Sequence, residues 1–189
     1  MPLHSKRVST RLAVALAALV ATVAAPSQAK TVKPPLHGQH WVAVTGKPLA
    51  ATAGARIFMQ GGNAVDAACA MIAATSTMWD VLSWGGETQA LIYNPHTRKV
   101  IGVNALGVAP TGATPEFYRS KGYDYPPEFG PLAAVTPGTP GGIMVMLAEY
   151  GKLSLAEVLA PAIELADGYP IEAQTADPHS LLNWTRRML

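Results

Sequence analysis

The chain has 189 residues, of which 49% are apolar and 14% charged, and its formal net charge is +2. This composition excludes a disordered tail, and the charge lacks the basic excess that is typical of nucleic-acid binding. The single cysteine excludes a disulfide scaffold and a cysteine-based zinc site. Length and composition therefore predict one domain with a core, or a piece of a larger domain.

The first 29 residues have the features of an export signal. Three basic residues and no acidic one precede an apolar run from Leu12 to Ala25, which is shorter than the roughly 20 residues of a spanning helix. Small residues at Ser27 and Ala29 fit a peptidase site. We predict a signal peptide over 1–29 rather than a stable membrane span, and a periplasmic or extracellular location. Cleavage would remove three cations and no acid, changing the net charge from +2 to −1.

Residues 30–40 are rich in lysine, proline and polar residues, which predicts an extended lead-in. The Trp-Val-Ala-Val run at 41–44 predicts a first strand. A helix is expected from Pro48, because proline is tolerated in a first helical turn. Gly61 and Gly62 should end it, since glycine accepts the left-handed geometry of a helix end.

A second helix is expected from Ala64 to about Met78, with Asn63 as its N-cap. Its apolar positions recur at helical spacing, and its other positions are mostly small and apolar, so it should be buried on most sides. Asp66 lies in the first turn, where a carboxylate favours the helix dipole. Cys69 lies on the apolar face without a flanking histidine or cation, which indicates a buried structural thiol rather than a nucleophile.

Residues 90–93 and 100–103 read as two strands, and the polar turn between them predicts a hairpin. The stretch 107–140 is rich in glycine and proline and should be mostly loop with short elements. A helix is expected over about 141–150. Another should start at Ser154 with a capping box, bend at its internal proline and end at a glycine, followed from Asp177 by a polar turn and a short helical segment.

No complete catalytic set is visible, and the residues predict no cofactor and no metal. His37 and His40 have a spacing that metals can use, but a polar lead-in accounts for them better. Gly85 and Gly86 would let a backbone approach a ligand, or form a tight turn. The run 136–142 would cradle an anion at a helix start, although a loop with positive φ fits it better. Asp80 and Glu87 read as solvated carboxylates.

Residues 60–68 match the Q-G-G-N-A-x-D-A-A signature and identify a resemblance to the γ-glutamyltranspeptidase family. Further blocks agree with the family in the same order, so the resemblance covers about residues 39–180. These blocks are Pro48–Ala50, Gly85–Gly86 before Leu91–Tyr93, Ala109–Pro110 at the end of R-E-T-A-P, Val135–Gly138 for A-V-P-G, and Tyr150–Ile163.

The resemblance implies an exported N-terminal-nucleophile hydrolase with an α/β fold, an αββα sandwich. Such precursors cut themselves into two subunits, and the new N-terminal threonine attacks the γ-glutamyl amide of glutathione-like substrates. That threonine is expected beyond residue 189. Residues 41–189 would then be an incomplete, N-terminal portion of the large-subunit region, inactive alone, with the small-subunit region and a small-molecule amide as partners and no nucleic acid.

Two departures from the family fall at the expected substrate site, which the resemblance places at Leu106, Gly85 and Gly86. Leu106 stands where the family has the arginine that holds the substrate's α-carboxylate, unless Arg98 or another cation substitutes for it. Glu87 and Thr88 replace the last two of four glycines. These changes indicate altered specificity for another amide or acylase substrate, or a non-catalytic periplasmic module. A further alternative is that this piece folds poorly alone.

Overall fold

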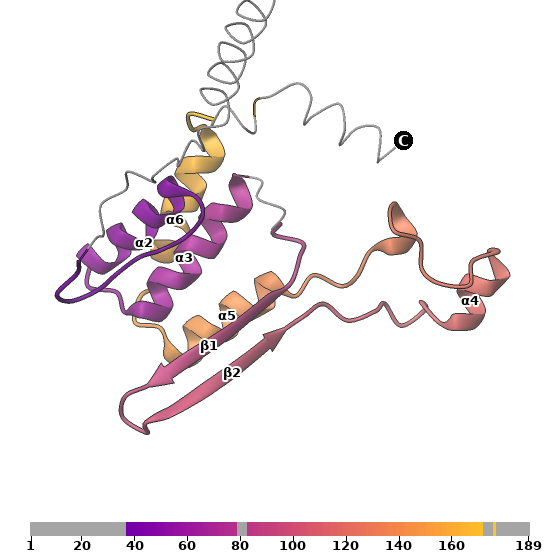
Figure 1. Ribbon diagram of the computed structural model, residues 1–189, viewed down its shortest axis with the longest axis horizontal. Coiled ribbons are helices and arrows are strands. Elements are labelled where there is room, and N and C mark those ends of the chain that lie inside the picture. Colours follow the sequence, from indigo (N-terminus) through magenta and orange to yellow (C-terminus); the bar gives the residue numbers. More distant parts are fainter. Residues whose placement is uncertain (1–36, 79–82, 172–175, 177–189) are drawn as a thin grey trace, which may run out of the picture. The chain divides into compact units, whose positions relative to one another are not determined.

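The computed structural model describes residues 37–78, 83–171 and 176 (Figure 1). The chain divides after His37, and the part from Gly38 onward contains the helices and strands described below. The predicted signal peptide and the expected segment from Asp177 lie outside the described residues.

Helix α2 runs from Pro48 to Met59 and has proline in its first turn, as predicted. The chain leaves the helix after Met59 through Gly61, whose φ of 88° favours glycine, and the N–H groups of Gly61 and Gly62 donate to carbonyls of the last turn. The two glycines therefore end the helix, as expected from the sequence.

The strand predicted over 41–44 is wrong, because these residues form no strand. Trp41 stacks on Phe58 of α2 with ring centroids 4.9 Å apart. Ala43 lies against Gly54 of the same helix. The apolar residues that suggested a strand are thus packed along a helix, and no neighbouring strand pairs with them in the described part of the chain.

Helix α3, Ala64–Thr77, contacts α2, α5 (Thr139–Tyr150) and α6 (Leu155–Asp167), so it is buried on most sides as predicted. Its many alanines let neighbouring backbones approach, and Gly54 of α2 is so close to Met71 that a Cβ atom there would lie 2.8 Å from its Cγ and force this side chain to shift. The main core cluster is Ile57, Ala67, Cys69, Ala70, Ile143, Met146, Leu147 and Val158. This arrangement makes α3 the central helix of the layer.

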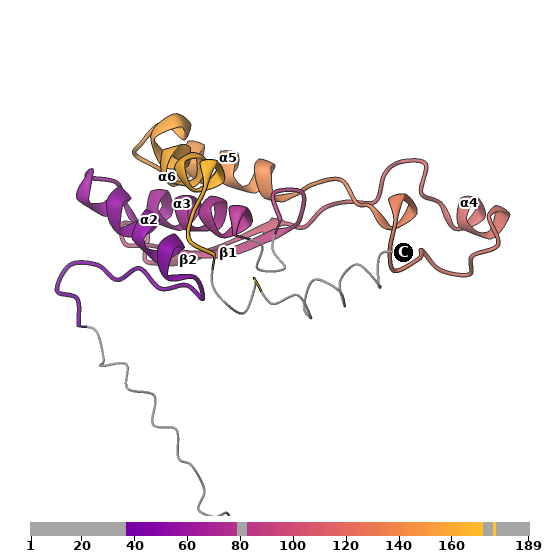
Figure 2. The same cartoon turned by 90° about the horizontal axis from the view of Figure 1, so that it is seen from above.

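The predicted hairpin is confirmed as β1, Thr88–Asn94, and β2, Lys99–Ala105, paired antiparallel. The Asn94 side chain accepts hydrogen bonds from two N–H groups of the turn. Figures 1 and 2 show α2, α3, α5 and α6 on one face of the hairpin, where α5 contacts both strands. The other face, here called the open face, exposes Leu91, Tyr93 and Val100.

Helices α5, Thr139–Tyr150, and α6, Leu155–Asp167, follow. The capping box of α6 is present: Ser154 accepts from the N–H of Glu157, and the Glu157 carboxylate accepts from the N–H of Ser154. Pro161 lies inside α6 and Gly168 ends it, as expected. A two-pronged ion pair between Arg56 and Glu164, with N–O distances of 2.6 and 2.8 Å, joins α2 to α6.

The glycine- and proline-rich stretch between β2 and α5 is mostly loop, as predicted. It contains the short helix α4, Pro115–Ser120, and one 3-10 turn, Pro131–Ala133. The Tyr118 hydroxyl donates to the carbonyl of Leu132, which joins these two elements. The two ends of the loop meet where the N–H of Thr136 donates to the carbonyl of Val108 at 2.9 Å.

Candidate functional site

The three predicted site residues lie together at the end of the hairpin opposite its turn. The last strand pair is Thr88 with Ala105, so Gly86 and Leu106 lie just beyond it on neighbouring segments. The carbonyl of Gly86 accepts from the N–H groups of Gly138 and Thr139 at 2.9 and 3.0 Å. Three segments therefore meet here, 83–88, 104–108 and 135–139, and we call this place the junction.

Two glycines make the junction possible. A Cβ atom on Gly138 would overlap the carbonyl oxygen of Ala105, and one on Gly107 would overlap the carbonyl oxygen of Thr136. Both obstacles are backbone atoms, which cannot rotate away as a side chain can. The close approach of these segments therefore requires glycine at both positions.

A buried hydrogen bond between two hydroxyls joins β1 to the start of α5. Thr88 and Thr139 are both buried, and their Oγ1 atoms are 3.0 Å apart. Thr88 is one of the departures from the four-glycine run. Its side chain is therefore used to fix α5 against the hairpin rather than to line an open loop.

The structure decides between ligand approach and a tight turn at Gly85–Gly86, and between an anion cradle and a loop at 136–142. The N–H of Gly86 donates to the carbonyl of Ser83 at 2.9 Å, and this hydrogen bond closes the tight turn. At the start of α5 the carbonyl of Gly86 already takes the N–H groups of Gly138 and Thr139, and Pro140 has no N–H. An anion would have to displace that carbonyl, so this run is not an anion cradle. The positive φ expected of the run is wrong, because Gly138 has a φ of −93° and Gly141 and Gly142 lie within α5.

Leu106 is 40% exposed, and its N–H donates to the side-chain oxygen of Asn104 at 3.1 Å. Arg98 does not stand in for the missing arginine. It lies in the turn at the opposite end of β2, roughly 25 Å away at the rise of an extended strand. The substitution of arginine by leucine is therefore not compensated by this residue.

The structure gives Asp66 a role that the sequence reading missed. Its carboxylate is fully buried and accepts from the N–H groups of Asn63 at 2.7 Å, Lys152 at 3.0 Å and Leu153 at 3.3 Å. Asn63 adds a bond from its side-chain amide to the carbonyl of Tyr150 at 2.6 Å. The Asn63–Asp66 pair thus caps α3 and also holds the turn between α5 and α6.

Cys69 is buried in the core, as the sequence predicted. Burial, helped by the nearby charge of Asp66, raises the pKa of its thiol to about 12. A thiol with so high a pKa stays protonated near neutral pH and is a poor nucleophile.

The thiol of Cys69 is therefore expected to resist a disulfide reagent in the native protein at about pH 8, and to react fully in denaturant. Because its folded pKa is raised, the neutral thiol's contribution to stability is complete below about pH 9 and is lost as the pH rises toward about 12. The absorbance of the thiolate released from the reagent measures how far Cys69 has reacted in the native and in the denatured protein. Rapid stoichiometric reaction of the native protein would contradict this placement.

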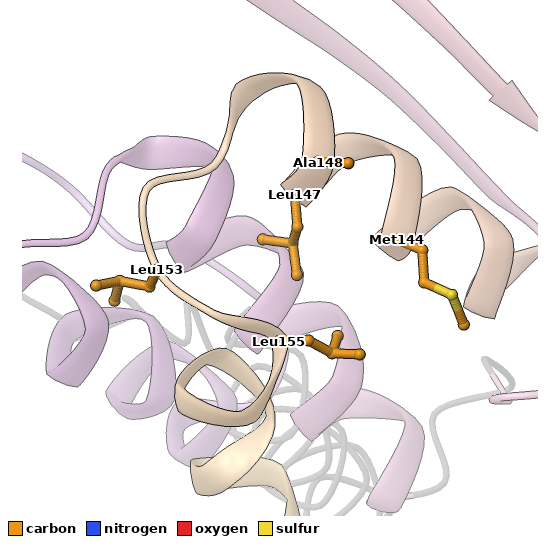
Figure 3. Close-up of a pocket in the computed structure, with 5 residues that line it drawn as sticks. All are labelled: Met144, Leu147, Ala148, Leu153 and Leu155. Atoms are coloured by element: carbon orange, nitrogen blue, oxygen red, sulfur yellow. The ribbon is translucent and has the colours of Figure 1, made fainter.

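An apolar hollow of about 280 Å³ lies beside the turn between α5 and α6 (Figure 3). Its lining residues are Met144, Leu147, Ala148, Leu153 and Leu155. None of these side chains can act as acid, base or nucleophile, and the hollow involves no residue of the junction. It is therefore not the candidate site.

Across residues 37–78, 83–171 and 176, no three His, Cys, Asp or Glu side chains gather as a metal site. Within the part of the chain that the structure describes, every helix is too short or too polar to span a bilayer.

The family model described as Gamma-glutamyltranspeptidase matches residues 50–186. The chain belongs to the γ-glutamyltranspeptidase family. It is 29% identical over 177 residues to the glutathione hydrolase proenzyme of Bacillus subtilis, covering 86% of this chain and 30% of that protein. It is 35% identical over 148 residues to the acylase ACY 1 proenzyme of a Pseudomonas species, covering 71% of this chain and 26% of that one.

Solved structures of the γ-glutamyltranspeptidase family give the same fold. The γ-glutamyltranspeptidase of Helicobacter pylori matches with a TM-score of 0.69 and 32% identity, over 76% of this chain and 42% of that one. A cephalosporin acylase from Bacillus halodurans matches with a TM-score of 0.66 and 34% identity, over 77% and 28%. The fold is therefore part of the α/β architecture of these N-terminal-nucleophile hydrolases. The chain spans about a third or less of the curated relatives named here.

Proposed function

We propose that this chain is the N-terminal portion of the large-subunit region of an enzyme that hydrolyses or transfers the acyl group of a small amide. The nucleophile would be a threonine C-terminal to residue 189, freed by self-cleavage of the precursor. Its hydroxyl oxygen would bond to the amide carbonyl carbon while the C–N bond breaks and the proton passes to the leaving amine. Water or an acceptor amine would then take the acyl group.

The observation that carries this proposal is the junction. Gly85–Gly86 and Leu106, which the resemblance places at the substrate site, are far apart in sequence, and the segment 135–139 joins them through the Gly86 and Val108 carbonyls. This meeting supports the proposal, because such an enzyme needs these blocks together beside its nucleophile.

Two acyl groups compete for this role. The family resemblance implies γ-glutamyl from glutathione-like amides. Leu106 favours an acyl group without a free α-carboxylate, because leucine cannot make the charge-assisted bonds that arginine makes, worth about 1.5–3 kcal/mol. The similarity to proteins named acylase ACY 1 proenzyme and cephalosporin acylase supports the second acyl class.

The open face of the hairpin supports a partner from the same precursor. Leu91 is 81% exposed, and Tyr93 and Val100 are also exposed, although an exposed sheet face is normally polar. We infer that strands of the small-subunit region cover this face. Residues 1–29 as a cleaved signal, residues 30–40 as a lead-in, and a periplasmic or extracellular location complete the proposal.

The proposal is tested with the full-length precursor that contains this chain. After incubation, the purified protein should release p-nitroaniline from at least one acyl p-nitroanilide, and γ-glutamyl p-nitroanilide is the first to try. Low kcat/KM with that substrate and higher kcat/KM with another acyl group would support the acylase alternative. Absence of release from every anilide, with a stable folded protein, would favour a non-catalytic module instead.

A further inference from the structure

The open face is apolar where it reaches the junction. Leu106 and Val108 are exposed, and burial alternates along β2 and beyond it, so both side chains lie on the face turned away from α5. Val135 lies against Gly107, with its Cγ2 atom 2.8 Å from the position of a Cβ there, which is on the opposite side from Leu106 and Val108. Two apolar side chains thus lie on the open face at the base of the loop.

The charges at the junction disfavour an anionic ligand. Its segments, 83–88, 104–108 and 135–139, contain no lysine or arginine, and Glu87 is their one ionisable residue. Glu87 is exposed and precedes Thr88, whose partner is Ala105, so continuing the register places it opposite Leu106. A substrate carboxylate here would meet apolar groups and a negative charge, without a cation from these segments.

We propose that the junction binds an acyl group that ends in an apolar chain and carries no carboxylate. This inference rests on the proposed amide acyl transfer and names the substrate class of that site. Leu106 and Val108 contact the alkyl chain, and Glu87 repels acyl groups with a terminal carboxylate. Each methylene that enters the site should raise kcat/KM about fourfold until the site is filled.

The test uses the processed precursor and a matched series of p-nitroanilides. The acyl groups are γ-glutamyl, glutaryl, 4-aminobutanoyl, butanoyl, pentanoyl and hexanoyl, which separate the effects of carboxylate, amine and chain length. We expect kcat/KM to rise from butanoyl to hexanoyl, and pentanoyl to exceed γ-glutamyl at least about tenfold. A flat alkyl series, or a preference for γ-glutamyl, glutaryl or 4-aminobutanoyl, would overturn the inference but leave amide acyl transfer standing. No release from any substrate would overturn both.

Variants test whether Leu106 causes the preference for an apolar acyl group. In Leu106→Arg, the γ-glutamyl to pentanoyl ratio of kcat/KM should rise at least about tenfold, because arginine pairs with the carboxylate. The ratio is independent of how much active enzyme each preparation contains. The matched control is Arg98→Asn, which removes a cation at the far end of the hairpin and should leave the ratio within about twofold.

An unchanged ratio in Leu106→Arg, or an equal change in Arg98→Asn, would contradict the assignment. If Leu106→Arg does not mature, Leu106→Ala tests the same assignment. This variant should flatten the rise of kcat/KM from butanoyl to hexanoyl. An unaltered rise of kcat/KM would count against Leu106 as a contact of the alkyl chain.

Discussion

Replacing Asp66 with alanine is expected to lower the free energy of unfolding by about 4 kcal/mol. The buried carboxylate accepts from three backbone N–H groups, of which those of Lys152 and Leu153 belong to the turn between α5 and α6. Alanine would leave these donors without the carboxylate that now accepts from them, and would also remove half of the α3 capping box. Urea denaturation followed by tryptophan fluorescence measures the loss.

A matched control for Asp66 is Asp124→Asn, which removes one carboxylate from an exposed position. Its effect should stay within about 0.5 kcal/mol. Asp66→Asn keeps the shape of the side chain but replaces one acceptor oxygen with a donor, so its loss should fall between the other two. A loss below about 1 kcal/mol in Asp66→Ala would mean that the α5–α6 turn does not depend on this carboxylate.

Replacing Gly138 with alanine should lower the free energy of unfolding by about 3 kcal/mol and disrupt the junction. The added Cβ would overlap the carbonyl oxygen of Ala105, and it would also lie 2.9 Å from the backbone nitrogen of Gly107. Because both obstacles are backbone, relief requires the start of α5 to move away from β2. That movement would break the bonds from Gly138 and Thr139 to the Gly86 carbonyl.

Gly141→Ala is the matched control, since it makes the same chemical change three residues further along α5. A Cβ atom there meets nothing within 4 Å, and alanine favours a helix over glycine by up to about 1 kcal/mol. Gly141→Ala should therefore be neutral or stabilising, whereas Gly138→Ala destabilises. Similar unfolding curves for the two variants would contradict the close packing at the junction.

Local signals in the sequence predicted most helix boundaries. Proline at the start of α2, the Asn63 cap of α3 and the Ser154 capping box of α6 each act within four residues, so they are readable from the sequence. The hairpin was predicted for the same reason, since its turn is local. The run at 41–44 has strand-like composition, but its partner is a helix that folds beside it, and no local pattern reveals that.

Long-range contacts could not be predicted in this way. Asp66 was expected to favour a helix dipole, but the donors that explain its burial lie 86 and 87 residues away. The Thr88–Thr139 bond spans 51 residues. The family resemblance implied that Gly85, Gly86 and Leu106 share a site, but the contact of Gly138 with the Gly86 carbonyl was not predicted and spans 52 residues.

The proposal that this chain belongs to a self-processed amide acyltransferase or hydrolase is tested most directly by measuring the intact mass of the full-length precursor after incubation with an acyl p-nitroanilide. We predict two fragments, the smaller starting with threonine and carrying one transient acyl group on that residue. A single uncut chain that never gains the acyl mass would contradict it.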